Sequence, residues 1–395
     1  MSEPMHATTT RQVWPAETLE AREERLLAEA RARTGYSDFG DPDFLEGLRT
    51  LLRAIRDDLD DRPNDELKEL IALLLDGRLH AEEGWKRHPE TRDAPVEAPL
   101  IIIGLPRTGT TAMHKLLSQD PQFQGLERWL AAFPTPRPPR ETWAQDPRFQ
   151  AMAAARALLR ERSPAVRTMH YTEAEQADEC IYAMEHSFRS NLFNSKYVLP
   201  TLDAWWRQLD ARPAMRRYRQ TLALIGAHDP GKPWLLKNPT HVYDVEAVLE
   251  VFPTASIVHT YREPREAIAS AASVMSRISG FEPSEREKQW RGQRELEVWA
   301  EGARRVLSAE ERVPERFFDA DYRKLLSAPL DLAHDIYRHF GLEMSALAEA
   351  RIREWIAANP QNKYGEHHYS LEEYGLTAAK VDEAFAAYNA KFGLR

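Results

Sequence analysis

The sequence predicts an α/β fold in which helices flank a parallel β-sheet. Short β-branched segments alternate with longer amphipathic segments, which is typical of strands and helices in βαβ order. The most apolar segment, 100–103 (LIII), indicates a buried strand, and a glycine-bearing loop and an amphipathic helix follow it. Three segments of helical composition precede that strand. We therefore expect an N-terminal helical extension ahead of the sheet and helical insertions between its strands.

The N-terminal extension is predicted from the helical composition of 17–33, which has no Gly or Pro, and from apolar residues at helical spacing over 44–60 and 65–80. Prolines and charged residues separate these segments from the first strand. We expect residues 1–95 to form a helical layer packed on a main domain of residues 96–395.

The main domain is expected to contain four strands, at 100–103, 234–237, 255–261 and 316–318. The proline-rich segment 134–139 cannot be regular helix, so we expect a loop there. Helices are predicted over 151–162, 173–188, 215–228, 242–251, 263–278, 285–307, 330–340 and 346–358.

Composition excludes several classes of protein. The 395 residues carry a net charge of −9 and no basic run, which is unlike a nucleic-acid-binding protein. No apolar run is long enough for a membrane helix, and the N-terminus does not resemble a secretory signal. Cys180 is the only cysteine. We expect a cytoplasmic protein without integral membrane association, in which a few placed cations hold any phosphate-bearing ligand.

The first motif is the loop 104–111 (GLPRTGTT), which lies between a predicted strand and a predicted helix. Loop amides and a helix N-terminus form an anion site in that context, so the sheet is expected to be of P-loop type. Thr110 stands where a Walker lysine would be, and the cation comes earlier, at Arg107. No carboxylate for Mg²⁺ is evident, which disfavours an ATPase or kinase, although a degenerate one stays an alternative.

The second motif is 261–264 (YREP), at the end of the strand 255–261. Arg262 lies at the strand end, where open α/β sheets bind ligands, and Ser270 lies about two turns into the next helix. A simpler interpretation is that Arg262 forms an ion pair with Glu266 and that Ser270 is a surface hydroxyl. Ser273, on the same predicted helix, is an alternative to Ser270 as the serine that binds the ligand.

Together the two motifs resemble those of the 3′-phosphoadenosine-5′-phosphosulfate (PAPS)-dependent sulfotransferases, in particular bacterial members with an N-terminal helical extension. The resemblance spans about 100–395. It implies that Arg262 and Ser270 hold the 3′-phosphate, whereas Lys363 matches a basic loop of the family only loosely and is as readily a solvated lysine. The residues implied for the 5′-phosphosulfate are Arg107, Thr108, Gly109, Thr110 and Thr111.

The catalytic residues are expected in the segment 237–241 (KNPTH), which resembles a family segment that flanks the sulfuryl group. The resemblance implies that Lys237 lies near the bridging oxygen and that His241 is the general base, with Arg107 binding the sulfuryl group. His170 and Glu175 remain alternative candidates for the base.

The predicted function is therefore direct in-line transfer of a sulfuryl group from PAPS, without a metal, to a hydroxyl of a small-molecule, lipid or sugar acceptor. A nucleotide-dependent kinase or NTPase and a non-catalytic nucleotide-binding scaffold are the alternatives. The acceptor and the oligomeric state are not encoded in any motif that we find.

Overall fold

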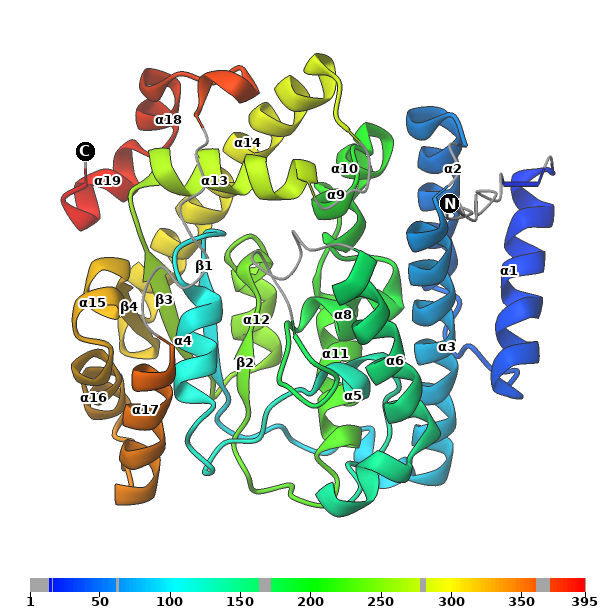
Figure 1. The fold of residues 1–395 in the computed structure, drawn as a ribbon, viewed down its shortest axis with the longest axis horizontal. Coiled ribbons are helices and arrows are strands. Elements are labelled where there is room, and N and C mark those ends of the chain that lie inside the picture. Colours follow the sequence, from blue (N-terminus) through cyan, green and yellow to red (C-terminus); the bar gives the residue numbers. More distant parts are fainter. Residues whose placement is uncertain are drawn as a thin grey trace, which may run out of the picture.

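The computed structural model describes residues 14–15, 17–61, 64–162, 172–277, 282–359 and 370–394. Its centre is one parallel sheet with the strand order β2-β1-β3-β4 (Figure 1). The predicted fold class, a parallel sheet flanked by helices, is confirmed. The four strands are β1 (Leu100–Gly104), β2 (Leu235–Lys237), β3 (Ser256–Tyr261) and β4 (Phe317–Asp321).

All four predicted strands are present, but β4 runs further than the predicted 316–318. The extension is polar, and Asp319 and Asp321 gave no hydrophobic signal. They are in the strand because β4 pairs with β3 up to the register Tyr261↔Asp321. Pairing with β3 therefore determines where β4 ends. This is common, because strand propensity depends on the neighbouring strands and on burial.

The central strand β1 is buried on both faces, and its side chains divide between two cores. Leu100 and Ile102 pack with α4 (Thr110–Leu117) and the helices near the C-terminus, whereas Ile101 and Ile103 face the larger core on the other side. This alternation is the period-two geometry of a strand. Helices cover one face as α4, α15 (Tyr322–Ser327), α16 (Pro329–Phe340) and α17 (Ala346–Ala358).

The second face of the sheet packs against long helices that carry the rest of the main core. Because these helices cover the sheet, β1 is sequestered from solvent. The helices of this side are α11 (Arg212–Ile225), α12 (Val245–Val251), α13 (Pro264–Arg277), α14 (Glu285–Arg312), α18 (Ala378–Ala384) and α19 (Ala386–Phe392).

Three N-terminal helices form the predicted helical layer, at the opposite end of the molecule from α15–α19 (Figure 1). These are α1 (Leu19–Thr34), α2 (Phe44–Leu59) and α3 (Asp65–Arg87). Their shared core also contains side chains from 181–202, so the layer is joined to the insertion between β1 and β2. The division at residue 95 stays a prediction.

The insertion between β1 and β2 consists of short helices. The proline-rich segment 134–139 lies between helical elements, as predicted. The elements are α5 (Arg128–Ala132), η2 (Arg140–Gln145), α6 (Pro147–Arg162), α8 (Ile181–Met184), η3 (Glu185–Ser187), α9 (Leu192–Lys196) and α10 (Pro200–Trp206). Further 3₁₀ turns are η1 (Pro89–Thr91), η4 (Pro239–Val242), η5 (Pro314–Arg316) and η6 (Glu372–Tyr374).

The predicted helix 173–188 is wrong over most of its length. Residues 172–180 form turns and an isolated bridge, and only α8 and η3 are helical. Long-range backbone bonds explain the difference: Asp178 N–H donates to Leu126 O at 2.8 Å, and Cys180 N–H donates to Lys237 O at 3.0 Å. Tertiary bonds thus override the local helix propensity.

Within the part of the chain that the structure describes, no helix combines the length and apolar character needed to cross a membrane.

Candidate active site

The loop after β1 has an unusual backbone. Gly104, Arg107 and Gly109 all have positive φ, at 151°, 69° and 90°. Glycine tolerates such angles, but Arg107 does so at a cost of about 1–2 kcal/mol. A Cβ at Gly109 would lie 2.7 Å from Leu325 Cδ2, so only glycine fits there. A non-glycine residue held in this conformation often marks a functional loop.

The predicted loop residues have different surroundings. The Thr108 hydroxyl is fully buried, donates to Leu105 O at 2.7 Å and lies 2.6 Å from the Thr260 hydroxyl, so it anchors the loop to β3. Thr110 and Thr111 begin α4, whose first amide groups have no acceptor within the helix. The helix end therefore provides amides and hydroxyls that are suited to an anion.

The two predicted phosphate motifs come together because β1 and β3 are neighbours. Arg107 Nε donates to Ser270 Oγ at 3.1 Å, and Arg262 Nη1 donates to Arg107 O at 3.1 Å. Arg262 also pairs with Glu266, with Nε 2.9 Å from Oε2, as the simpler reading of the sequence expects. Its guanidinium lies over the Tyr322 ring, 4.5 Å from the centroid.

Lys237 lies at the end of β2, next to β1, with its side chain only 1% exposed. Its ammonium lies 3.4 Å from Thr111 Oγ1 and forms an ion pair with Glu179. Arg107, Arg262 and Lys237 thus stand at the carboxyl ends of β1, β3 and β2, respectively, or shortly after them. This is the edge at which open α/β sheets bind ligands.

His241 lies in η4 beneath this edge. Its ring is buried, and neither ring nitrogen has a hydrogen-bond partner among the described residues. Burial lowers the pKa of His241 to about 3, and the charge of Glu179 opposes that shift only in part. The imidazole is therefore neutral at physiological pH, and it is close enough to Glu179 to sense its charge.

The remaining predicted residues are placed as follows. His170 and Lys363 lie outside the described residues. Glu175 is exposed, four residues before the carboxylate that pairs with Lys237. Ser273 is buried and hydrogen-bonds with Tyr374, so Ser270 is the serine that contacts the loop.

Glu179 is the residue that sequence reasoning missed at this site. Its segment, 170–179, carries several carboxylates, and the helix expected over 173–188 gives no reason to single out Glu179. The bond from Cys180 N–H to Lys237 O fixes Glu179 beside β2. No local sequence signal reports such a bond.

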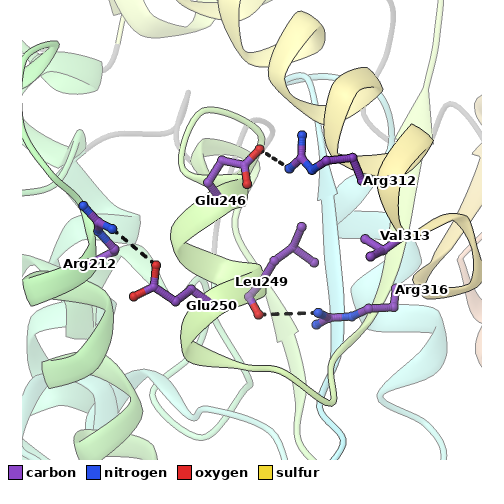
Figure 2. A pocket seen from close by; sticks show the side chains of 7 residues that line it. All are labelled: Arg212, Glu246, Leu249, Glu250, Arg312, Val313 and Arg316. Carbon is purple, nitrogen blue, oxygen red and sulfur yellow. Dashed lines mark hydrogen bonds and ion pairs between the residues drawn. The ribbon is translucent and has the colours of Figure 1, made fainter.

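A separate pocket lies at the opposite edge of the sheet (Figure 2). It is lined by Arg212, Glu246, Leu249, Glu250, Arg312, Val313 and Arg316. Leu249 and Arg316 stand before the first residues of β3 and β4, far from the loop after β1. Arg212 pairs with Glu250, Arg312 with Glu246, and Arg316 donates to backbone oxygens, so each arginine already has a partner.

One group of described residues has the ligand types of a metal site: His259, Glu310 and Asp319. His259 Nδ1 lies 2.9 Å from Asp319 Oδ1, and the Lys391 ammonium pairs with both carboxylates. The group is therefore an internally paired ionic cluster that anchors α19. The absence of a metal requirement stays a prediction.

The comparisons with known proteins point to one family. A model of the sulfotransferase family matches residues 99–346. The crystal structure of sulfotransferase STF1 from Mycobacterium tuberculosis is similar, with 33% identity, a TM-score of 0.81, and coverage of 92% of this chain and 98% of that chain. Sulfotransferase STF9 from Mycobacterium avium has 28% identity and a TM-score of 0.83, with 94% and 97% covered.

A curated relative is the omega-hydroxy-beta-dihydromenaquinone-9 sulfotransferase Stf3 of Mycobacterium tuberculosis and Mycobacterium bovis. It is 22% identical over 315 residues, which cover 75% of each chain.

Proposed function

The chain belongs to the sulfotransferase family and is a sulfotransferase enzyme, and from that premise we propose that its donor is PAPS and its acceptor a hydroxyl of a small molecule or lipid. The observation that carries the proposal is the convergence of Arg107, Arg262 and Lys237 at one edge of the sheet. Three cations, loop amides and a helix end suit a ligand with two separated anionic groups.

The binding roles that we propose follow the contacts. The loop amides, Arg107, Thr110 and Thr111 bind the 5′-phosphosulfate, and Thr108 and Gly109 hold the loop in shape. Arg262 and Ser270 bind the 3′-phosphate, and Arg262 exchanges its pairing with Glu266 for that phosphate. Lys363 remains a further candidate for this phosphate.

The donor supplies a sulfuryl group bonded to a phosphate oxygen. In the transfer, the bond between sulfur and that oxygen breaks while a bond forms between sulfur and the acceptor oxygen. Lys237 and Arg107 stabilise the negative charge that develops on the leaving phosphate and the sulfuryl oxygens. Holding the acceptor in line with the breaking bond provides much of the remaining acceleration.

A base must take the acceptor proton, and we propose Glu179 for this role. Its carboxylate pairs with Lys237, so it stands at the group that would neutralise the leaving oxygen. His241, the base predicted from the sequence, is neutral and so can accept a proton, but its pKa of about 3 makes it a weak base. His170 and Glu175 remain the other sequence-based candidates.

The proposed acceptor class is supported by the curated relative. Stf3 acts, according to its name, on a hydroxylated menaquinone derivative, and it resembles this chain over 75% of the length of both.

We propose a cytoplasmic site of action, supported by the single cysteine, Cys180, which is buried and unpaired.

The proposed function is tested with the purified full chain, PAPS carrying a ³⁵S-labelled sulfuryl group, and a panel of hydroxylated phenols, sugars and quinol lipids. The expected result is a labelled acceptor and one equivalent of 3′-phosphoadenosine-5′-phosphate (PAP), without added metal. Failure to transfer label to any member, together with transfer of phosphate from γ-labelled Mg-ATP, would contradict the proposal.

A further inference from the structure

The turn that carries Arg262 belongs to neither a strand nor a helix. Tyr261 is the last residue of β3, and α13 begins at Pro264, which has no backbone N–H to donate. The pairing of Arg262 with Glu266 is an exposed one that the proposed 3′-phosphate replaces. Once that exchange has taken place, the backbone of the turn determines where the guanidinium lies.

The residue before Arg262 is stacked on the last residue of α19. The rings of Tyr261 and Phe392 are within 10° of parallel, with 4.0 Å between their centroids. One turn earlier in α19, the Tyr388 ring packs against Phe392 at a centroid distance of 4.8 Å and an angle of 70°. Aromatic pairs have preferred geometries, so these contacts orient α19 against the end of β3.

Tyr388 also reaches the backbone of Arg262 itself. The Tyr388 side chain is buried, and burial raises the pKa of its hydroxyl, whereas the backbone N–H of Arg262 faces the phenol oxygen and opposes that rise. The pairing of β3 with β4 ends at Tyr261, so this contact lies where the strand no longer holds the chain.

The other end of the turn is held by α18. Arg265 is the second residue of α13, and its Nε donates to Asp382 Oδ1 at 2.6 Å, while its Nη2 donates to the second oxygen of the same carboxylate. Figure 1 shows α18 next to α13. A bidentate pair fixes the orientation of both groups as well as their distance. Both side chains are partly exposed, so the pair adds little to the stability of the fold.

α19 is in turn joined to the sheet by Lys391. Its ammonium lies 2.8 Å from Asp319 Oδ2 in β4 and also pairs with Glu310 of α14. The other oxygen of Asp319 lies 2.9 Å from His259 Nδ1 in β3. The two helices are therefore a support that is fixed to the sheet and that contacts the turn at positions 261, 262 and 265.

Resting on the function proposed above, we propose that α18 and α19 position Arg262 for the 3′-phosphate, with Phe392, Tyr388 and Asp382 as positioning residues. Contacts on both sides of Arg262 restrict the backbone of the turn, so less ordering of the chain is needed when the phosphate binds. A nucleotide without a 3′-phosphate does not use Arg262 and gains nothing from this support. The two helices thus contribute to the selection of a 3′-phosphorylated donor, and they do so through Arg262.

The test compares PAP with AMP, which lacks the 3′-phosphate, by calorimetric titration of the full chain. The ratio of the two Kd values reports the contribution of the 3′-phosphate alone. Phe392→Leu removes the ring but keeps an apolar side chain, and Asp382→Asn removes the charge that pairs with Arg265. Each variant is expected to lower the preference for PAP about three- to tenfold and to leave the Kd of AMP within about twofold of the wild type.

Three further variants serve as controls. Phe392→Tyr keeps the stacked ring and should keep the preference for PAP. Phe340→Leu removes a half-buried ring that packs on the other face of the sheet, and Asp210→Asn removes a carboxylate that pairs with Arg212 at the start of α11. Neither should change the ratio. Because its ion pair is partly exposed, Asp382→Asn stays informative if Phe392→Leu fails to fold.

The outcomes separate the two proposals. Wild-type protein that binds PAP and AMP equally contradicts the proposed donor. If the wild type prefers PAP, either of two results overturns the positioning role and leaves the donor assignment standing. One is a preference that is unchanged in both Phe392→Leu and Asp382→Asn, and the other is a loss of affinity that is equal for PAP and AMP.

Discussion

Arg107 Nε donates a hydrogen bond to Ser270 Oγ across 3.1 Å, although 163 positions separate the two residues in the sequence. The contact joins the loop after β1 to α13 and brings the two proposed phosphate sites to one place. It also distinguishes Ser270 from Ser273, whose hydroxyl bonds with Tyr374 instead. The nucleotide is therefore expected to bind across this contact.

Replacing Ser270 by alanine is expected to weaken PAP binding about tenfold, because a hydroxyl donor to a charged phosphate is lost. Ser273→Ala is the matched control, since it removes a buried hydroxyl of the same helix that does not contact the loop. Calorimetric titration of both variants with PAP measures the difference. Equal losses in the two variants would mean that the effect comes from packing of α13.

Replacing Glu266 by glutamine is expected to tighten PAP binding, because Glu266 competes with the 3′-phosphate for Arg262. The Glu266 side chain is 56% exposed, and surface ion pairs contribute about 0–1 kcal/mol, so the gain is at most about fivefold. It should shrink at high salt. Glu285→Gln removes another exposed acid, which pairs with Lys288, and should change nothing. Weaker binding in Glu266→Gln would contradict the competition.

The base is tested by Glu179→Gln and His241→Gln. Loss of a general base lowers the rate about 10²–10⁴-fold, and we expect this for Glu179→Gln in steady-state transfer assays. His241→Gln should keep kcat within about tenfold, because an imidazole with a pKa of about 3 has little driving force to accept the proton. The melting temperature of each variant controls for folding. The reverse ranking would make His241 the base.

Glu185 is expected to make stability depend on pH. It is buried, accepts from the Ser190 hydroxyl, and its pKa is raised to about 8 by burial. The folded protein therefore holds a proton that the unfolded chain releases above its ordinary pKa of about 4.3. The free energy of unfolding should fall as pH rises between these values, by up to about 1.4 kcal/mol per pH unit.

The measurement for Glu185 is urea unfolding of the wild type and Glu185→Gln at about pH 5 and pH 8. The variant lacks the titrating group, so its stability should change less over this range. Equal changes in the two proteins would show that Glu185 is ionised in the folded state.

Local signals were enough to predict the centre of the fold and the cations of the site. The run of β-branched residues in β1, Gly109 at the start of α4 and the strand end at Arg262 each reflect a conformation that neighbouring residues determine. The parallel order of the strands then follows from alternation with helices. For this reason Arg107, Lys237, Arg262 and Ser270 were predicted near one another.

Long-range bonds explain what could not be predicted. The segment 173–188 has helical composition, but its backbone bonds to Leu126 and Lys237 hold residues 172–180 outside a helix. Those bonds place Glu179 at Lys237.

The central claim is that this chain binds a 3′-phosphorylated donor without a metal, and a calorimetric titration of the metal-free protein tests it most directly. PAP, its 3′-dephosphorylated analogue AMP, and ATP are compared in the wild type and in Arg262→Ala. The account predicts that PAP binds at least about tenfold more tightly than the other two and that Arg262→Ala abolishes this preference. Equal binding of all three nucleotides, or binding of ATP only with Mg²⁺, would contradict it.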